Sequence, residues 1–353
     1  MQILSVGTAQ PPHYYDQETL LAAFTKAWSQ KHHNPRRVEQ LHRAVMVGGR
    51  HLALPMERYE SLSGFGESNR AFIEVGTEVG AKAIEDALAQ AGLKPTDVDA
   101  IFFASVTGIS APSIDAKLVN RLGFRSDIKR TPIFGLGCVA GAAGTARLYD
   151  YLRAWPDHVA VLLTVELCSL TLQIKDLSIP NLIASGLFGD GAAAVLAAGS
   201  ERAKTLAAKG PKVTATKSRF YPDSEGVMGW DISESGFGIV LTAAVPAMVE
   251  QHVRQDVDGF LSEHDLTRSD IGCWVCHTGG PKVLTAFQTA LEVDEEALEL
   301  TWTSLREVGN LSSASVLYVL RDTIAQRKPP EGTPGMMLAM GPGFCSELVL
   351  MEW

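Results

Sequence analysis

The feature that most constrains the fold of this chain is an internal repeat relating its two halves. Each half predicts, in the same order, a helix, a hydroxyl residue followed by aspartate, an apolar strand, a turn and another helix. Asp97 precedes Cys138 by 41 positions, and Asp270 precedes Asn310 by 40. Cys138 and Asn310 thus occupy equivalent strand-to-helix corners, where ligand chemistry gathers in α/β folds. Chance is the alternative, because βαβα alternation is common. The predicted elements are 71–91, 100–104, 113–122 and 131–134 in the first half, and 243–261, 272–276 and 281–291 in the second.

Composition excludes several classes of protein. The chain has 353 residues, of which 46% are hydrophobic and 20% charged, as in globular proteins. Its net charge of -9 disfavours binding to nucleic acid or to an anionic membrane face. No apolar run reaches the roughly 18 residues of a membrane span, and the start MQILSVGTAQ is typical of a first strand rather than a signal peptide. The five scattered cysteines argue against a disulfide framework and indicate a cytoplasmic location. We predict two halves, 1–210 and 211–353.

Cys138 is the first candidate for chemistry. It lies in Gly-Leu-Gly-Cys-Val-Ala-Gly-Ala-Ala-Gly, where small residues allow the following helix to pack closely and be buried. The positive end of a helix dipole lowers the pKa of a thiol, and free N–H groups there can hold an oxyanion. The pattern predicts a nucleophile with a lowered pKa. The alternative is a small structural cysteine in a tight helix.

His277 and Asn310 are the candidates from the second half. His277 ends an apolar strand and precedes a Gly-Gly-Pro turn, a position from which an imidazole can meet a thiol and form an ion pair. Asn310 opens Gly-Asn-Leu-Ser-Ser-Ala-Ser and offers a neutral amide donor able to polarise a thioester carbonyl. A structural histidine and a helix N-cap asparagine are the alternatives.

Three further motifs favour structural roles. Cys273 and Cys276 have metal-site spacing, but they lie in an apolar strand with no second cysteine pair, so we predict no metal site. Phe188 to Gly191 and Gly341 to Gly343 read as turns beside strands.

Taken together, these segments resemble the type III polyketide synthases, the chalcone synthase-like branch of the thiolase fold. The resemblance covers nearly the whole chain and rests on GCVAG, CHTGGPKVL, GNLSSAS, GLFGDGAAAV and GPGFCSELVL. It is closest to the bacterial members, and among these to enzymes that make alkylpyrones or alkylresorcinols from long-chain acyl starters. It implies an α/β fold of the thiolase type, duplicated and built in five αβαβα layers, and a homodimer.

The resemblance also implies a mechanism and its residues. Cys138 takes a starter acyl group as a thioester, while His277 and Asn310 bind the malonyl thioester carbonyl and stabilise the enolate formed by decarboxylation. The enolate attacks the acyl-cysteine, and repeated cycles precede cyclisation. The substrates are acyl-CoA and malonyl-CoA, and no metal or other cofactor is implied.

The resemblance assigns further residues to the cavity and to the coenzyme A tunnel. Phe188 matches an aromatic gate between tunnel and cavity, and Arg50 and Lys282 would hold the phosphates of coenzyme A, with Gly280 beside them and Arg43 a weaker candidate. The cavity and its cyclisation loop would be lined by Thr171, Cys168, Ser312, Gly341, Pro342 and Gly343.

Departures from the plant enzymes bear on the starter. Ile239 stands at a second gatekeeping aromatic, Ala111 at a methionine that crosses the plant dimer interface, and Ala339–Met340 replaces Gly-Phe. These residues put an aromatic starter in doubt and leave room for an apolar tunnel that fits a fatty acyl chain. Each buried methylene contributes about 0.8 kcal/mol, so chain length alone can set the preference.

Two rival functions remain at this point. Ketoacyl synthase III has the same Cys-His-Asn set but condenses once and takes malonyl from a carrier protein; the HTGGPK and GPG segments favour the polyketide branch. An inactive thiolase-like scaffold is the rival from another class, and the presence of all three chemical residues disfavours it.

Overall fold

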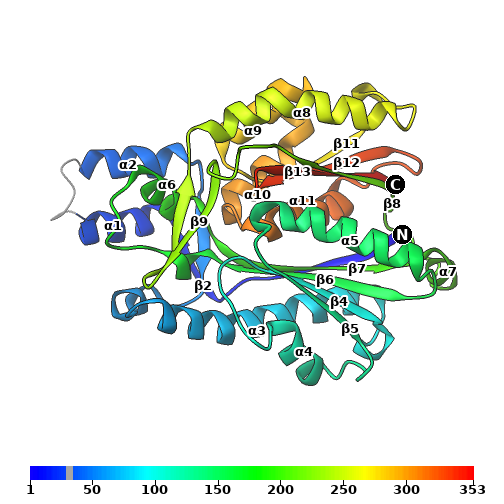
Figure 1. The fold of residues 1–353 in the computed structure, drawn as a ribbon, viewed down its shortest axis with the longest axis horizontal. Helices are drawn as coiled ribbons and strands as arrows, with labels where there is room; N and C mark the ends of the chain where they lie inside the picture. Colours follow the sequence, from blue (N-terminus) through cyan, green and yellow to red (C-terminus); the bar gives the residue numbers. More distant parts are fainter. Residues whose placement is uncertain (29–34) are drawn as a thin grey trace.

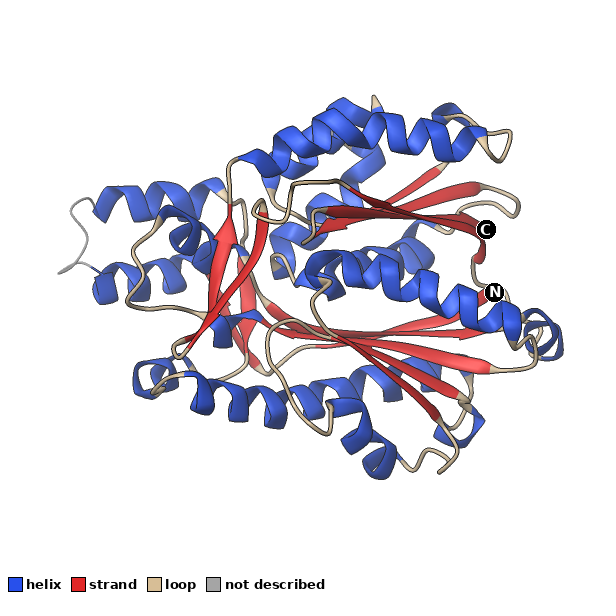
Figure 2. Ribbon diagram, viewed as in Figure 1, coloured by secondary structure: helices blue, strands red, loops and turns tan. Residues whose placement is uncertain are grey.

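A computed structural model describes residues 1–28 and 35–353. Nine strands of the described chain are hydrogen-bonded in one continuous order that folds into two stacked sheets, and two further pairs form small separate sheets. Helices cover both outer faces of the stack and fill the layer between the two sheets (Figures 1 and 2). This arrangement confirms the predicted five-layer αβαβα fold. The two sheets are joined where β1 meets β8 through the pairing of Gln2 with Lys212.

The first sheet belongs to the N-terminal half and has the order β1-β7-β6-β4-β5. Strand β4 runs parallel to both β5 and β6, whereas β7 is antiparallel to β6 and β1. Every residue of β6 and β7 is buried, as expected for strands covered by helices on both faces. The strands are β1 (Gln2–Ala9), β4 (Ala100–Ala104), β5 (Lys129–Ile133), β6 (Val159–Leu167) and β7 (Asp190–Ala198).

The second sheet has the order β11-β12-β13-β8. Strands β11 and β12 are parallel, and β13 is antiparallel to β12 and β8. The strands are β8 (Lys212–Phe220), β11 (Cys273–Cys276), β12 (Pro334–Gly341) and β13 (Cys345–Glu352).

Three helical layers enclose the sheets (Figure 1). Helices α3 (Phe65–Ala91) and α4 (Ile114–Leu122) cover the first sheet, and α8 (Ala244–Ser262) and α9 (Pro281–Leu291) cover the second. Helices α5 (Ala140–Ala154) and α11 (Ser315–Asp322) lie between the sheets, within a core drawn from both halves. The remaining helices and hairpin strands are α1 (Gln17–Trp28), α2 (Pro35–Ala44), α6 (Ile179–Leu187), α7 (Ser200–Thr205), α10 (Glu299–Val308), β2 (His13–Asp16), β3 (Gly49–Leu52), β9 (Met228–Ser233) and β10 (Gly236–Leu241).

The internal repeat is visible in matched turns. Asp97 ends a 3-10 turn and accepts the backbone N–H of Lys94 at 2.8 Å, and Asp270 does the same for Thr267 at 2.7 Å. Each turn leads into a strand, β4 or β11. The predicted boundary at residue 210 falls between α7 and β8 and stays a prediction.

The small residues of α5 have the predicted packing role. A Cβ atom on Gly141 would lie 2.3 Å from the carbonyl oxygen of Ser313, and one on Gly144 would lie 2.5 Å from a methyl of Leu162. Glycine at both positions therefore lets α5 approach the segment before α11 and the first sheet closely.

Candidate active site

Cys138 lies in a 3-10 turn (Gly137–Val139) that leads into α5, at the layer shared by both halves. Its side chain is buried, and its Sγ atom lies 3.7 Å from Oγ of Ser312, which precedes α11. A Cβ atom on Gly137 would meet the ring of Pro342 at 2.8 Å, so the loop between β12 and β13 packs directly against this turn. The structure thus brings Cys138, Ser312 and Pro342 together.

The protonation state of Cys138 differs from the sequence prediction. Burial raises the pKa of this thiol to about 12, and the nearby Glu166 carboxylate raises it further, although the contact with Ser312 lowers it. The prediction of a lowered pKa at a helix N-terminus is therefore wrong for the free protein, because desolvation of a thiolate outweighs the helix dipole at a fully buried position.

His277 follows the last residue of β11, at the carboxyl end of that strand. Its backbone N–H donates to the carbonyl of Leu338 at 3.0 Å, and its side chain is 3% exposed. Burial lowers the pKa of His277 to about 4, so the imidazole is neutral near pH 7. Within the described part of the chain its Nδ1 has no hydrogen-bond partner, and the thiol of Cys138 bonds to Ser312 rather than to this ring. The predicted ion pair is absent from this state.

Asn310 is held in place by its backbone and by its side chain. Its N–H donates to the carbonyl of Leu187, and its own carbonyl accepts from Gly189, both at 2.9 Å, so it bridges to Phe188. Its Oδ1 accepts the backbone N–H of Ser312 at 2.8 Å and the hydroxyl of Ser315 at 3.3 Å. Helix α11 begins at Ser315, so Asn310 belongs to the loop before the helix.

Leucine 187 links the histidine segment to the asparagine. A Cβ atom on Gly280, three residues after His277, would lie 3.5 Å from Leu187, whose carbonyl binds Asn310. Both segments therefore converge on the end of α6, which leads into half-buried Phe188.

The other predicted cavity residues fall into two groups. Cys168 and Thr171 are buried in one 3-10 turn after β6, where the hydroxyl of Thr171 donates to the carbonyl of Cys168 at 2.8 Å. Gln173 fastens the β9–β10 hairpin, which carries half-buried Ile239, to this turn by donating to the carbonyls of Ser235 and Phe237. Ala111 is not brought to this group, because it lies in an exposed loop between β4 and α4.

The segment from Gly341 to Gly343, predicted to shape the cyclisation pocket, links β12 to β13. A Cβ atom on Gly341 would lie 2.6 Å from the backbone nitrogen of Val139, so this position requires glycine for the loop to approach the Cys138 turn. Pro342 and Gly343 are half-buried, and the thiol of Cys345 donates to the carbonyl of Pro342 at 3.3 Å.

The prediction that Arg50 holds the phosphates of coenzyme A is wrong in this structure. Arg50 is 1% exposed, and its guanidinium donates to the carbonyls of Ser185 and Gly186 near the end of α6. Burial lowers its pKa to about 10, and attraction to buried Asp190 opposes that shift. A phosphate cannot reach a guanidinium enclosed in this way, so Arg50 caps α6 instead.

The other two cations predicted to bind coenzyme A, Lys282 and Arg43, are exposed. Lys282 stands in the first turn of α9, directly after Gly280 and Pro281. Arg43 pairs with Glu18 at 2.6 Å and with Glu39 at 3.1 Å, so its charge is already compensated.

Comparison with known proteins agrees with this geometry. A family model described as "Chalcone and stilbene synthases, N-terminal domain" matches residues 1–201, and the model of the C-terminal domain matches residues 212–352. The chain belongs to the chalcone and stilbene synthase family and is a type III polyketide synthase.

Individual relatives agree with that assignment. The chain is 49% identical over 351 residues to a 1,3,6,8-tetrahydroxynaphthalene synthase of Streptomyces peucetius, covering 99% of this chain and 93% of the relative. A putative chalcone synthase of Bacillus subtilis is 37% identical, with coverage of 99% and 98%. The solved structure of a tetrahydroxynaphthalene synthase from Streptomyces coelicolor superposes with a TM-score of 0.92 at 32% identity, covering 100% and 99% of the two chains. As a type III polyketide synthase, the chain is a condensing acyltransferase.

Glu166 is a residue of this polyketide synthase that the sequence analysis missed. It is fully buried in β6 and accepts hydrogen bonds from the hydroxyls of Thr107 and Ser313 and from the backbone N–H of Val106. Burial raises its pKa to about 7. The signal was a single carboxylate in the otherwise apolar run VAVLLTVEL, because buried acids are rare unless they are paired or functional.

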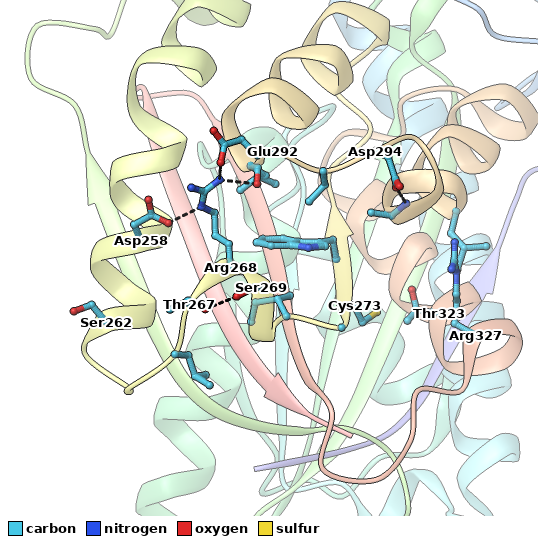
Figure 3. A pocket seen from close by; sticks show the side chains of 18 residues that line it. Asp258, Ser262, Thr267, Arg268, Ser269, Cys273, Glu292, Asp294, Thr323 and Arg327 are labelled. Carbon is cyan, nitrogen blue, oxygen red and sulfur yellow. Dashed lines mark hydrogen bonds and ion pairs between the residues drawn. The ribbon is translucent and has the colours of Figure 1, made fainter.

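One pocket of the synthase is separate from these residues. It has a volume of about 770 Å³ and lies between the end of α8, the end of α9 and the start of β11 (Figure 3). Cys273 lies on its wall, whereas His277 follows the other end of the same strand. Arg268 is already bound there by Asp258 and Glu292, so the pocket's most buried cation is compensated.

Two further findings concern the described residues. No group of three or more His, Cys, Asp or Glu side chains among them is arranged to hold a metal ion. Their helices also include none with the length and apolar character needed to cross a bilayer.

Proposed function

We propose that Cys138 is the acyl-carrying nucleophile of this synthase and that His277 and Asn310 activate malonyl-CoA. The observation that carries this proposal is the contact network at the shared layer: the thiol of Cys138 meets Ser312, whose backbone N–H binds Asn310, while the Nδ1 atom of His277 is unpartnered within the described chain. Thiol, imidazole and carboxamide come from both halves of the chain.

Loading begins from a neutral thiol and a neutral imidazole. As the acyl-CoA carbonyl approaches, His277 accepts the thiol proton and the sulfur attacks the carbonyl carbon. The bond to coenzyme A then breaks, and His277 returns the proton to the departing sulfur, so coenzyme A leaves as a thiol. Neutral His277 suits this step because only a deprotonated ring nitrogen can act as a base. The buried site keeps water away from the acyl-enzyme.

Chain extension uses Asn310 and His277 as hydrogen-bond donors. Carbon dioxide leaves malonyl-CoA, the electrons of the broken bond form an enolate, and the amide N–H of Asn310 and an N–H of His277 stabilise its oxygen. The enolate carbon then attacks the acyl-cysteine carbonyl, the sulfur leaves, and the chain is two carbons longer on coenzyme A. These steps consume only CoA thioesters and need no further cofactor.

Two starters have support. The apolar replacement Ile239 favours a long-chain fatty acyl-CoA and an alkylpyrone or alkylresorcinol product. The relatives named for tetrahydroxynaphthalene, and a phloroglucinol synthase of Pseudomonas fluorescens at 30% identity, favour malonyl-CoA as both starter and extender. Polyhydroxylated rings with oxygen on alternate carbons assemble from two-carbon units without an alkyl starter.

One product experiment separates these starters. Purified enzyme is given malonyl-CoA alone and then malonyl-CoA with hexanoyl-, lauroyl-, palmitoyl- or 4-coumaroyl-CoA, and the products are identified by mass. Alkylated products formed faster with increasing chain length support the fatty acyl starter. A polyhydroxylated aromatic product from malonyl-CoA alone, unchanged by added acyl-CoA, supports the second candidate. Faster turnover of 4-coumaroyl-CoA contradicts both.

Partners of the reaction are proposed on the same basis. Lys282, exposed at the start of α9, is the candidate cation for coenzyme A phosphates, because the segment before it meets the end of α6 beside Phe188. A homodimer is proposed across β5, an edge strand whose first four residues are exposed. Phe134 and Ile109, 52% and 47% exposed, supply apolar surface there.

A further inference from the structure

The side chain of Asn310 can work only if its amide nitrogen, and not its oxygen, faces the substrate. A carboxamide has nearly the same shape after a half-turn, so its orientation must be fixed by neighbours. An inverted amide would present an acceptor to the thioester oxygen and would repel the enolate instead of stabilising it.

The backbone of Ser312 fixes one side of the amide. Its N–H lies 2.8 Å from the Asn310 side chain, and a backbone N–H can only donate, so the atom facing it must be Oδ1. Ser312 itself has φ +49°, a left-handed conformation uncommon outside glycine.

Ser315 fixes the amide from a second direction. Its hydroxyl accepts the backbone N–H of Leu311 at 2.7 Å, and its single proton is therefore directed toward Asn310 Oδ1, 3.3 Å away. The side chain is 1% exposed at the first position of α11, so water does not compete for either bond. Two donors converge on Oδ1, and the NH₂ group is turned to the opposite side.

We propose that Ser315 is a positioning residue that orients the Asn310 amide for enolate stabilisation. This inference rests on the proposed function of Asn310. It connects Ser315 to the nucleophile through continuous contacts, because Ser312, the other donor to Asn310, also receives the thiol of Cys138 at 3.7 Å. Removing the hydroxyl leaves one donor on Oδ1 and allows the amide to invert for part of the time.

The test is a double-mutant cycle on malonyl-CoA decarboxylation, measured as carbon dioxide release, with acylation of Cys138 followed separately by mass spectrometry. Ser315→Ala is expected to lower kcat for decarboxylation about tenfold, the order expected for one buried hydrogen bond, with KM and the acylation rate changed less than about twofold. Ser315→Cys keeps a weaker donor of similar size, so its kcat for decarboxylation is expected to lie between those of Ser315→Ala and the wild type. It replaces Ser315→Ala in the test if the alanine variant is unstable.

The decisive comparison is with Asn310→Ala. If Ser315 acts through Asn310, adding Ser315→Ala to Asn310→Ala causes no further loss. An additive loss, or an equal slowing of acylation, overturns the positioning role. Normal decarboxylation by Asn310→Ala alone would instead overturn the proposed function of Asn310. Thr323→Val, which likewise removes a buried hydroxyl, is the matched control, since Thr323 bonds to Val319 in the preceding helical turn and lies outside the site.

Discussion

The sulfur of Cys138 and the hydroxyl oxygen of Ser312 lie 3.7 Å apart, although 174 residues separate them in the chain. This contact joins the proposed nucleophile of the N-terminal half to the loop that carries Asn310 in the C-terminal half. Because the site is buried on both sides, the contact forms where a thiolate is poorly solvated, and the free enzyme holds a neutral thiol.

Alkylation of Cys138 tests that protonation state. With a pKa raised to about 12, the thiolate fraction keeps rising with pH, so the rate of iodoacetamide labelling should increase through pH 9 without a plateau. Ser312→Ala removes a group that lowers the pKa, and labelling should slow at every pH. Peptide mass spectrometry gives the rates, and Cys138→Ala, which should not load an acyl group, is the blank. A plateau near neutral pH would show instead that the helix dipole dominates.

Substitutions of Arg50 and Lys282 should distinguish a charge that stabilises the fold from a charge that binds coenzyme A. Arg50→Met leaves the carbonyl of Ser185 without its donor and that of Gly186 with only the amide of Gln17. An unsatisfied carbonyl costs about 1–3 kcal/mol, so Tm should fall while KM for malonyl-CoA in the folded fraction stays unchanged. Lys282→Ala should do the reverse, raising KM about three- to tenfold with little change in Tm. Lys94→Ala, an exposed lysine beyond the site, is the control for loss of surface charge. Unchanged KM for Lys282→Ala would remove that residue from the coenzyme A contact.

Glu166 should make the stability of the protein decrease as pH rises. Its pKa is about 7 in the folded protein against an ordinary value of 4.5, so the folded state keeps a proton that the unfolded state releases between these pH values. Its stabilising contribution is complete below pH 4.5 and is lost as pH rises through 7, by about 3 kcal/mol. Urea denaturation of the wild type and of Glu166→Gln at several pH values measures the difference. If the free energy of unfolding depended on pH in the same way for both proteins, the raised pKa of Glu166 would be contradicted.

The β5 edge should control assembly. Phe134→Asp places a charge on exposed apolar surface beside this strand, and we expect a shift from dimer to monomer in size-exclusion chromatography with light scattering. Ile232→Asp, on an equally exposed apolar residue of β9, should leave the mass unchanged. A Phe134→Asp protein that remains dimeric would move the interface elsewhere.

The repeated elements could be predicted from the sequence because their signals are local. Apolar runs bounded by turns gave β4 and α9 with the observed limits, and Asp97 and Asp270 marked equivalent turns. The equivalence of Cys138 and Asn310 followed from their spacing. Such features depend on neighbours a few positions away.

Features that depend on distant packing could not be read in the same way. Arg50 looks like a surface cation until α6, over a hundred residues later, encloses it. The pKa of Cys138 depends on burial beneath the loops of the other half, and an isolated helix N-terminus gives the opposite sign. Glu166 accepts hydrogen bonds from Thr107 and Ser313, which belong to two other segments of the chain, and the sequence does not show that these segments lie beside it.

The matched corners at α5 and α11 also bear on how such a molecule arose. A chain formed by duplication of one half would have begun with the same side chain at both corners. In the present chain one corner holds a thiol and the other an amide, so the order of the elements is alike in the two halves while the chemistry differs. Either half alone would carry only some of the proposed site residues, so the two halves must stay joined for the site to be complete.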